Sequence, residues 1–312
     1  MIKGRKVTIL GTGNVGSTIA YTLALKELAS EVVLVDINEE KAEGEAMDII
    51  QGARFIAPMK IYSGSYSDAN DSDIVIYTLG MPRKAGMTRL DLVNVNVDIF
   101  RGVVGEVMQH APEAVHLVVS NPVDVLTYAV TKLSGLPTGR VIGSGTLLDT
   151  SRLRAILSNR TGRSYVNIHA YVLGEHGDTS FIPWSMASIF GVKAADCMDA
   201  KYPGQNWRTE VLDDVRKAGA RVIAGKGATY FAIAMSVCEI CKDIFTNSKV
   251  IVSVSSMLNG QYGIDDVCLS LPFAVGAQGI ADCLYARFTP EEEEHLRASA
   301  DALKAVCHEI KF

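Results

Sequence analysis

The first 143 residues alternate between two patterns of apolar and polar positions. Short apolar runs rich in Val and Ile are typical of β-strands, and such runs occur at residues 6–10, 31–36, 73–79, 115–120 and 140–142. Segments with apolar residues at every third or fourth position are typical of helices, and these occupy residues 15–29, 38–52, 90–110 and 123–134. Strands that alternate with helices predict βαβ units in a parallel sheet, and nearly continuous apolar strands predict helices on both faces.

The pattern changes after about residue 143. Helical spacing continues at residues 148–159, 207–226 and 228–246, with strand-like segments at 167–173 and 249–258. Thr289-Pro290 followed by acidic residues predicts a helix start, because Thr caps the first turn and acids favour the positive helix end. We therefore predict an α/β fold, with a doubly wound parallel sheet in residues 1–143 followed by a mixed α+β domain in residues 144–312.

Composition excludes several classes of protein. The 312 residues include 35 acidic and 30 basic side chains, a net charge of -5, with no basic run, so we expect no nucleic acid partner. No apolar stretch is long enough for a membrane helix, and the N-terminus does not have the pattern of a signal peptide. The six scattered cysteines are typical of a reduced, cytoplasmic protein. Cys238 and Cys241 form a C-x-x-C within a helical pattern, and we interpret them as core thiols.

A glycine-rich turn follows the first predicted strand. Gly11, Gly13 and Gly16 fit the pattern G-x-G-x-x-G and open a predicted helix. Glycines there allow a tight turn and close approach of the backbone to a pyrophosphate, and the helix N-terminus favours the negative charge. Asp36 ends the second strand, where a carboxylate can accept hydrogen bonds from ribose hydroxyls and repel a 2′-phosphate. The sequence therefore predicts a Rossmann-type domain that binds NAD rather than NADP.

Three residues in the second half are candidates for catalysis. Asp149 and Arg152 are three positions apart in a predicted helix and share one side of it. His176 has glycines nearby on both sides, which suggests an unusual backbone path. From the residues alone, each is also compatible with an ordinary structural role.

Longer stretches make the chain recognisable as similar to a known family. GTGNVG, GMTRLDLV, SNPVDVLTY, VIGSGTLLDTSRLR and HAYVLGEHGDTS resemble the NAD-dependent lactate/malate dehydrogenase family, and the resemblance covers essentially the full length. The body of the sequence is most similar to the bacterial L-lactate branch. The resemblance implies reversible hydride transfer between NADH and a small 2-keto acid, with a cofactor domain at residues 1–143 and a substrate-binding, catalytic domain at 144–312.

The resemblance also implies catalytic roles. His176 would be the general acid and base at the substrate oxygen, and Asp149 would orient its ring and stabilise the imidazolium. Arg152 would bind the substrate carboxylate through a bidentate fork, a geometry that Lys cannot reproduce. Arg89 would polarise the carbonyl.

Further positions match residues around the cofactor and the substrate. Asn121, which precedes Pro122 in a bond that is cis in the family, and Ser144 would line the nicotinamide region. Residues 81–90 match a mobile lid that excludes water. The expected cofactor-binding set is Gly11, Gly13, Asn14, Val15, Gly16, Asp36, Gly80, Asn121 and Ser144.

The choice of substrate depends on one discordant residue. Arg83 stands in the lid where lactate enzymes usually have Gln and malate enzymes have Arg, and a guanidinium there would pair with the second carboxylate of oxaloacetate. Thr229 and the stretch VIGSGTLLDTSRLR fit the lactate branch instead. We expect pocket chemistry to outweigh background similarity, which favours malate and oxaloacetate; lactate and pyruvate are the alternative.

Arg154 and His169 match positions that bind fructose 1,6-bisphosphate in allosteric bacterial lactate enzymes. The resemblance therefore suggests a sugar bisphosphate effector, with a surface Arg and a buried His as the structural alternative. It also implies a homo-oligomer, a dimer or a tetramer.

Two other classes of function were weighed. A non-catalytic NAD-binding module would keep the glycine turn but lose the catalytic set, and here all four catalytic matches are present. A metal-dependent hydrolase would need clustered ligands, and we expect no metal site because no cluster occurs among His110, His116, His169, His176, His295 and His308.

Overall fold

A single mixed sheet runs through the protein, as the computed structural model shows for residues 4–81 and 89–310, with only the backbone described at Arg89. Its parallel part comprises β1 (Lys6–Leu10), β2 (Glu31–Val35), β3 (Lys60–Ser63), β4 (Ile74–Tyr77), β5 (Val115–Val118) and β6 (Val141–Gly143). Its antiparallel part comprises β10 (Val250–Asn259), β11 (Asp265–Gly276) and β12 (Gly279–Cys283). The spatial order is β12-β11-β10-β6-β5-β4-β1-β2-β3.

The order of the parallel strands reverses between β1 and β4. This is the doubly wound arrangement that the alternating pattern predicts. In such folds ligands bind in a crevice outside the carboxyl ends of the strands at the point of reversal, here beyond β1 and β4. All four residues of β4 and of β5 are buried. Strands of this kind must be covered on both faces, as predicted.

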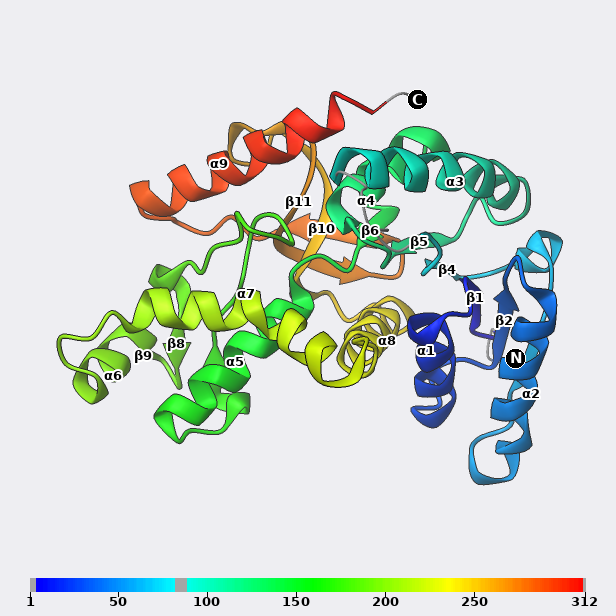
Figure 1. Cartoon of the computed structure of the whole chain (residues 1–312), viewed down its shortest axis with the longest axis horizontal. Coiled ribbons are helices and arrows are strands. Elements are labelled where there is room, and N and C mark those ends of the chain that lie inside the picture. The colour runs from blue at the N-terminus through cyan, green and yellow to red at the C-terminus, as the bar shows by residue number, and fades with distance from the viewer. Residues whose placement is uncertain (1–3, 82–88, 311–312) are drawn as a thin grey trace.

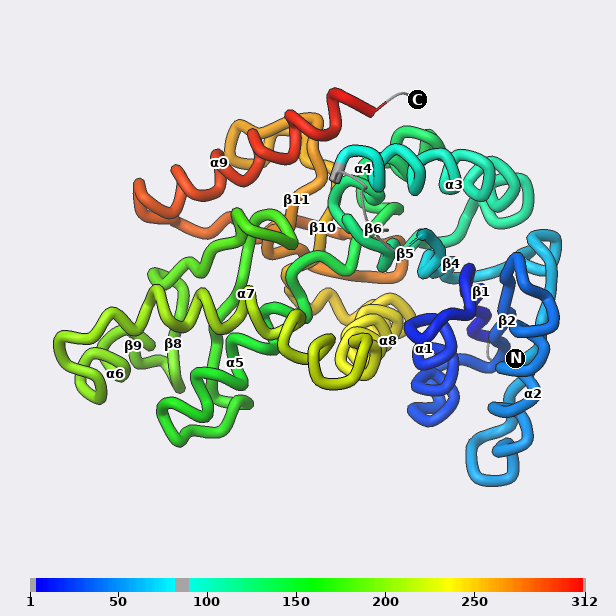
Figure 2. The backbone as a smooth tube through the Cα atoms, in the orientation of Figure 1, coloured from blue at the N-terminus to red at the C-terminus, as the bar shows by residue number. Residues whose placement is uncertain are grey.

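Helices cover both faces of the sheet (Figures 1 and 2). One face carries α1 (Asn14–Leu25), α2 (Glu39–Gln51) and α8 (Phe231–Thr246). The other carries α3 (Arg89–His110), α4 (Val123–Ser134) and α9 (Pro290–Cys307). The strands and helices around the crevice therefore come from both halves of the chain.

A smaller layer lies beside the main sheet. It contains α5 (Leu147–Thr161), α6 (Ala194–Lys201) and α7 (Trp207–Lys226), with a three-stranded sheet of β7 (Ile168–His169), β8 (Ser188–Ile189) and β9 (Val192–Lys193). Short 3-10 helices occupy Ala53–Phe55, Tyr66–Ala69, Tyr165–Asn167, Trp184–Met186 and Gln261–Gly263. Trp207 anchors this layer, with its ring edge-on to Trp184 at a centroid distance of 4.9 Å.

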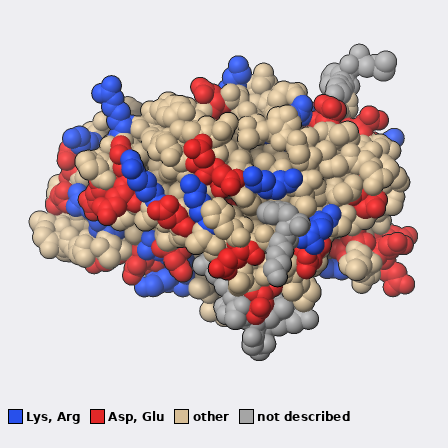
Figure 3. Space-filling model, turned by 90° about the horizontal axis from the view of Figure 1, so that it is seen from above, with Lys and Arg blue, Asp and Glu red and all other residues tan. Residues whose placement is uncertain are grey.

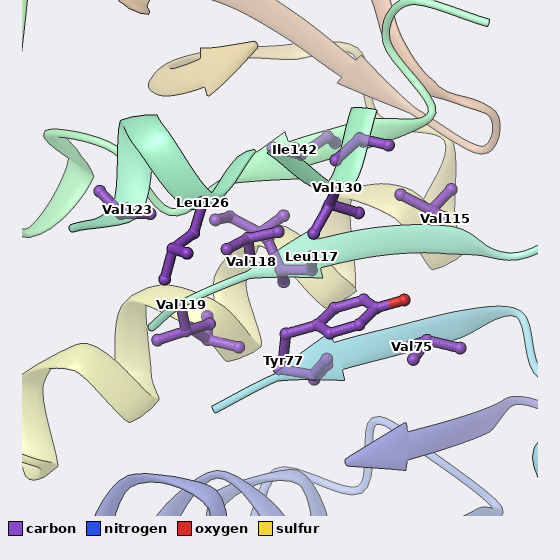
Figure 4. Close-up of a cluster of buried hydrophobic side chains, with 14 of the residues drawn as sticks. Val75, Tyr77, Val115, Leu117, Val118, Val119, Val123, Leu126, Val130 and Ile142 are labelled. Carbon is purple, nitrogen blue, oxygen red and sulfur yellow. The ribbon is translucent and has the colours of Figure 1, made fainter. Parts of the chain in front are cut away.

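The core of the main sheet is aliphatic with one aromatic pair at its centre. Figure 4 shows Val118 of β5 and Leu126 of α4 in a cluster of buried hydrophobic side chains, with Tyr77 projecting from β4 beside them. The Tyr77 ring stacks on Phe100 of α3 at 5.6 Å. This packing fixes the parallel strands and therefore the positions of the loops that leave their carboxyl ends.

The predicted start of the last helix is confirmed in detail. Thr289 accepts a hydrogen bond from the backbone N–H of Glu292, and the Glu292 carboxylate accepts the N–H of Thr289 in return. Glu292 also accepts two hydrogen bonds from Ser185. The capping box thus ties α9 to the smaller layer.

Several elements are absent from the pattern-based prediction, among them the strands β3, β8, β9, β11 and β12 and the helix α6. β3 is a short edge strand, and Pro272 interrupts the apolar run of β11. A proline argues against a strand in sequence, yet the sheet tolerates it there. Because β10 to β12 extend the main sheet beyond β6, the C-terminal half completes that sheet instead of forming only a separate layer. The domain boundary at residue 143 stays a prediction.

Cys238 and Cys241 are fully buried in α8, as expected for core thiols. Burial raises the pKa of Cys238 to about 12 and that of Cys241 well above its ordinary value, so both stay as thiols.

Acidic and basic side chains intermingle on the face drawn in Figure 3. Within the described ranges, no helix is both long and apolar enough to cross a membrane.

We predict an acid sensitivity of the core that depends on His116. This side chain is fully buried, bonds Tyr77 Oη at 2.8 Å through Nδ1, and burial lowers its pKa to about 4. Between pH 6.5 and 4, His116 binds a proton in the unfolded chain but stays neutral in the folded protein. As the pH falls through this range, His116 therefore lowers the free energy of unfolding by up to about 3 kcal/mol. When unfolding by urea is measured at pH 7.5 and at pH 4.5, the free energy of unfolding should decrease less between the two for His116→Gln than for the wild type. His308→Gln, at an exposed histidine, is the control, and an equal decrease in all three proteins would refute the prediction.

Candidate active site

The glycine-rich turn joins β1 to α1 at the edge of the crevice. Gly11 has a φ of 96°, and a Cβ on it would lie 2.9 Å from the backbone nitrogen of Leu79. A Cβ on Gly16 would lie 1.9 Å from the carbonyl oxygen of Gly11, which no side chain tolerates. Gly13 caps α1 and has open space beside it. The turn thus presents bare backbone and a helix N-terminus to the crevice, which suits a pyrophosphate.

Asp36 lies at the end of β2, directly beside this turn. Its Oδ2 accepts hydrogen bonds from the backbone N–H of Thr12 at 2.6 Å and from the Thr12 hydroxyl at 2.9 Å, and its Oδ1 accepts the N–H of Asn38. Burial alone would raise the pKa of Asp36, but these hydrogen bonds and Lys41 hold it below its ordinary value. The group is a carboxylate at neutral pH and retains capacity to accept a further hydrogen bond.

Asn96, which the sequence analysis does not single out, organises the neighbouring strand end. Gly80 has a φ of 137°, and a Cβ on it would approach Asn96 Oδ1 to 3.1 Å. Asn96 is buried in α3, accepts the N–H of Met81 at 2.8 Å, and donates to the carbonyl oxygen of Asn121 at 3.5 Å. It therefore connects the segments that leave β4 and β5. The peptide bond from Asn121 to Pro122 is cis, as the resemblance implies.

The structure brings His176, Asp149 and Arg152 into one hydrogen-bonded chain. Asp149 and Arg152 project from the first turns of α5, and His176 lies on the loop after β7. His176 Nδ1 is 2.5 Å from Asp149 Oδ2, and Arg152 Nη1 is 2.8 Å from Asp149 Oδ1. Gly174, with a φ of 88°, turns the backbone just before His176, which matches the expected unusual path. The three residues are thus coupled through one carboxylate.

Burial and charge act in opposite directions on these groups. Burial would lower the pKa of His176, but the hydrogen bond and charge of Asp149, with a smaller effect of Asp124, hold it above its ordinary value. Burial would raise the pKa of Asp149, but His176 and Arg152 hold it below. The arrangement gives an imidazole that is easily protonated near neutral pH, next to a carboxylate that stays ionised.

Arg152 keeps donors free for a ligand. Asp149 is the only hydrogen-bond partner of its guanidinium within residues 4–81 and 89–310, and it uses one nitrogen. Gly219 of α7 faces the same guanidinium, and a Cβ there would lie 3.5 Å from Nη2. Gly219 belongs to no motif, because only the packing of α7 on α5 brings it to the site.

The structure describes only some of the remaining expected residues. Ser144 is buried just after β6, and Thr229 lies on the link between α7 and α8. Asn14 and Val15 open α1. Arg83 and most of the expected lid lie outside the described residues, as does the side chain of Arg89.

The two expected effector residues lie close to each other. Arg154 donates to the carbonyl oxygen of Ala170 at 3.2 Å and lies over the Tyr171 ring, while His169 on β7 is exposed. The buried position considered for His169 is therefore wrong. A bisphosphate site at these residues stays a prediction, as does the homo-oligomer. No group of three or more metal-binding side chains occurs among the residues whose structure is described.

Comparison with known proteins accounts for nearly the whole chain. Residues 5–143 match the family of lactate/malate dehydrogenase NAD binding domains, and residues 146–311 match the lactate/malate dehydrogenase alpha/beta C-terminal domain. The chain belongs to the NAD-dependent lactate/malate dehydrogenase family. It is thus an NAD-dependent 2-hydroxy acid dehydrogenase.

Its relatives are similar along their full length. The chain is 46% identical to an L-lactate dehydrogenase of Acetivibrio thermocellus, covering 97% of this chain and 96% of that protein. It is also 46% identical to L-lactate dehydrogenase 1 of Clostridium acetobutylicum, covering 97% and 98%. The solved structure of the minor L-lactate dehydrogenase of Enterococcus mundtii superimposes with a TM-score of 0.95 at 38% identity and 99% coverage of both chains.

These relatives bear on the choice of substrate. They carry the name of lactate enzymes, so the comparisons do not support the preference for malate that Arg83 suggested, and they favour the lactate alternative.

The chain uses NAD, and its residues fit that cofactor. The missing Cβ atoms of Gly11 and Gly16 allow the tight turn and its close packing, Gly13 caps α1 with open space beside it, and Asp36 provides an ionised acceptor next to the turn.

We predict that Gly16→Ala weakens NADH binding while Gly44→Ala does not. The new methyl at position 16 would overlap the carbonyl oxygen of Gly11, whereas nothing lies within 4 Å of a Cβ at Gly44 in α2. The dissociation constant of NADH, measured by fluorescence, should rise by about tenfold or more in the first variant and stay within about twofold in the second. Equal affinity of the two variants would show that the turn does not contact the cofactor.

Proposed function

We propose that this dehydrogenase interconverts pyruvate and L-lactate. The observation that carries the proposal is the hydrogen-bonded chain of Arg152, Asp149 and His176, which offers a carboxylate-binding cation and a proton donor within one site. The names of the relatives support the choice of substrate.

His176 serves as the acid and the base in this scheme. Because Asp149 is ionised, we assign the ring a proton on Nδ1, and this N–H donates a hydrogen bond to Asp149 Oδ2. Nε2 is then the atom that gives a proton to the carbonyl oxygen of pyruvate and takes it back from the hydroxyl of lactate. Asp149 fixes the orientation of the ring and stabilises its charged form.

Arg152 binds the carboxylate of the substrate in this proposal. Its free N–H groups suit a bidentate pair, and its bond to Asp149 limits the rotation of the guanidinium. Gly219 leaves the space beside it open. The substrate carboxylate would thus be held next to the imidazole that exchanges the proton.

The other expected residues complete the site. When bound, the cofactor donates hydride to the keto carbon or accepts it from the hydroxy acid. We propose that Asn121, Ser144 and Thr229 line the region where this exchange occurs, with Arg89 polarising the carbonyl. Residues 81–90 would exclude water as the lid of the family does.

Steady-state kinetics on two keto acids test the proposal. We expect a higher kcat/KM for pyruvate than for oxaloacetate, and Arg83→Gln should change the ratio of the two by less than about threefold. A guanidinium that did pair with the second carboxylate of oxaloacetate would be worth about tenfold to a hundredfold in that ratio. Arg163→Gln, at an exposed arginine elsewhere, is the control for the loss of a cation.

Two results would contradict the proposal. One is a preference for oxaloacetate that Arg83→Gln reverses, which would restore malate as the substrate. The other is His176→Asn turning over either acid at the wild-type rate, since loss of a general acid is expected to lower kcat by about 10²–10⁴.

A further inference from the structure

A second carboxylate contacts the catalytic loop, the segment that carries His176. Asp124 lies in the first turn of α4, and its Oδ2 accepts the backbone N–H of His176 at 2.7 Å. Its side chain is 2% exposed, so water does not compete for this hydrogen bond. Within the described residues this is the hydrogen bond that joins α4 to His176, and Asp124 has no part in the proposed proton transfer or carboxylate binding.

The surroundings of Asp124 are nearly free of cations. The groups that face it are His176 and Glu175 on the loop, the Ser255 hydroxyl on β10, and the thiols of Cys268 and Cys307. Its Oδ1 has no hydrogen bond of regular geometry within the described chain, and neither has the Ser255 hydroxyl. Of these groups, His176 is the one that can become positively charged in the neutral range.

Burial of this carboxyl has a direct consequence for its ionisation. Burial raises the pKa of Asp124 to about 6, and Glu175 adds to this, while Ser255, the N–H and the ring of His176 oppose it. Above pH 6 the group is therefore mostly an anion. Its charge acts on His176 in the same direction as that of Asp149 and against that of Arg152.

We propose that Asp124 is a positioning residue for His176, which holds the backbone of the catalytic loop against α4 and supplies a second negative charge that stabilises the protonated ring. This inference rests on the proposed role of His176. It assigns two separable effects to one side chain. The hydrogen bond fixes the position of the His176 backbone from which the side chain extends, and the charge raises the proton affinity of the ring.

Two substitutions separate the effects. Asp124→Asn keeps the shape and one oxygen that accepts the N–H of His176, but it removes the charge. Asp124→Ala removes both the acceptor and the charge. Asp243→Asn is the matched control, because Asp243 is another buried aspartate, in α8, that bonds Ser248 and does not contact the loop.

The decisive experiment is an NMR titration of the His176 ring in the free enzyme, with its signal assigned by its absence in His176→Asn. We expect Asp124→Asn to lower the pKa of His176 by about 0.5 to 1 unit, the effect of one nearby buried charge, and Asp243→Asn to leave it unchanged. In parallel, the pH above which kcat/KM for pyruvate declines should shift down by the same amount. Asp124→Ala should in addition lower kcat by about tenfold or more while the dissociation constant of NADH stays within about twofold.

A second variant covers the case in which Asp124→Ala does not fold. Ser255→Ala removes the hydroxyl that stabilises the carboxylate of Asp124, so it should lower the pKa of His176 in the same direction by a smaller amount. An unchanged pKa of His176 in Asp124→Asn would overturn the inference. Full activity of His176→Asn would instead overturn the proposed function, and a shifted titration in Asp124→Asn would then still support the coupling of the two residues.

Discussion

The hydrogen bond between Asp149 and His176 is the interaction on which the rest of the site depends. At 2.5 Å it joins an ionised carboxylate to an imidazole, and it reverses the effect that burial alone would have on the proton affinity of that ring. The same carboxylate holds Arg152. A single side chain thus orients both groups for which we propose a role in the reaction: the imidazole that would exchange the proton and the guanidinium that would bind the substrate carboxylate.

The fold places this hydrogen bond at the edge of the main sheet where the parallel strands end. Asp149 comes from the start of α5, His176 from a loop after β7, and Asp124 from the start of α4. The strands β5 and β6 are neighbours in the main sheet, and each leads into a helix at its carboxyl end. The sheet therefore places the starts of α4 and α5 next to each other. The glycine turn after β1 and Asp36 after β2 lie at the same edge, so cofactor and substrate positions follow from one strand order.

Much of this could be predicted from the sequence because the responsible signals are local. The alternation of strands and helices predicted the parallel sheet, and G-x-G-x-x-G with Asp36 predicted the cofactor. Resemblance over long motifs identified His176, Asp149 and Arg152, which composition and spacing alone left as ordinary polar residues. What could not be predicted depends on tertiary contacts. Pro272 interrupts the apolar pattern of β11. Asn96 and Gly219 carry no motif of their own. Asp124 lies within SNPVDVLTY, but its contact with His176 arises only in the folded structure. The substrate expectation depends on Arg83, which lies outside the described residues, and the names of the relatives favour the lactate alternative instead.

The most direct test of the central claim is the pH dependence of both reaction directions in the wild type and in Asp149→Asn. The account predicts that pyruvate reduction declines above a pKa that lies above 6.5, and that lactate oxidation declines below a pKa set by the same ring. Asp149→Asn should lower this pKa and kcat together, because the imidazolium loses its partner. If the substitution leaves the profile and the rate unchanged, the bond between Asp149 and His176 does not control the chemistry and the account is wrong.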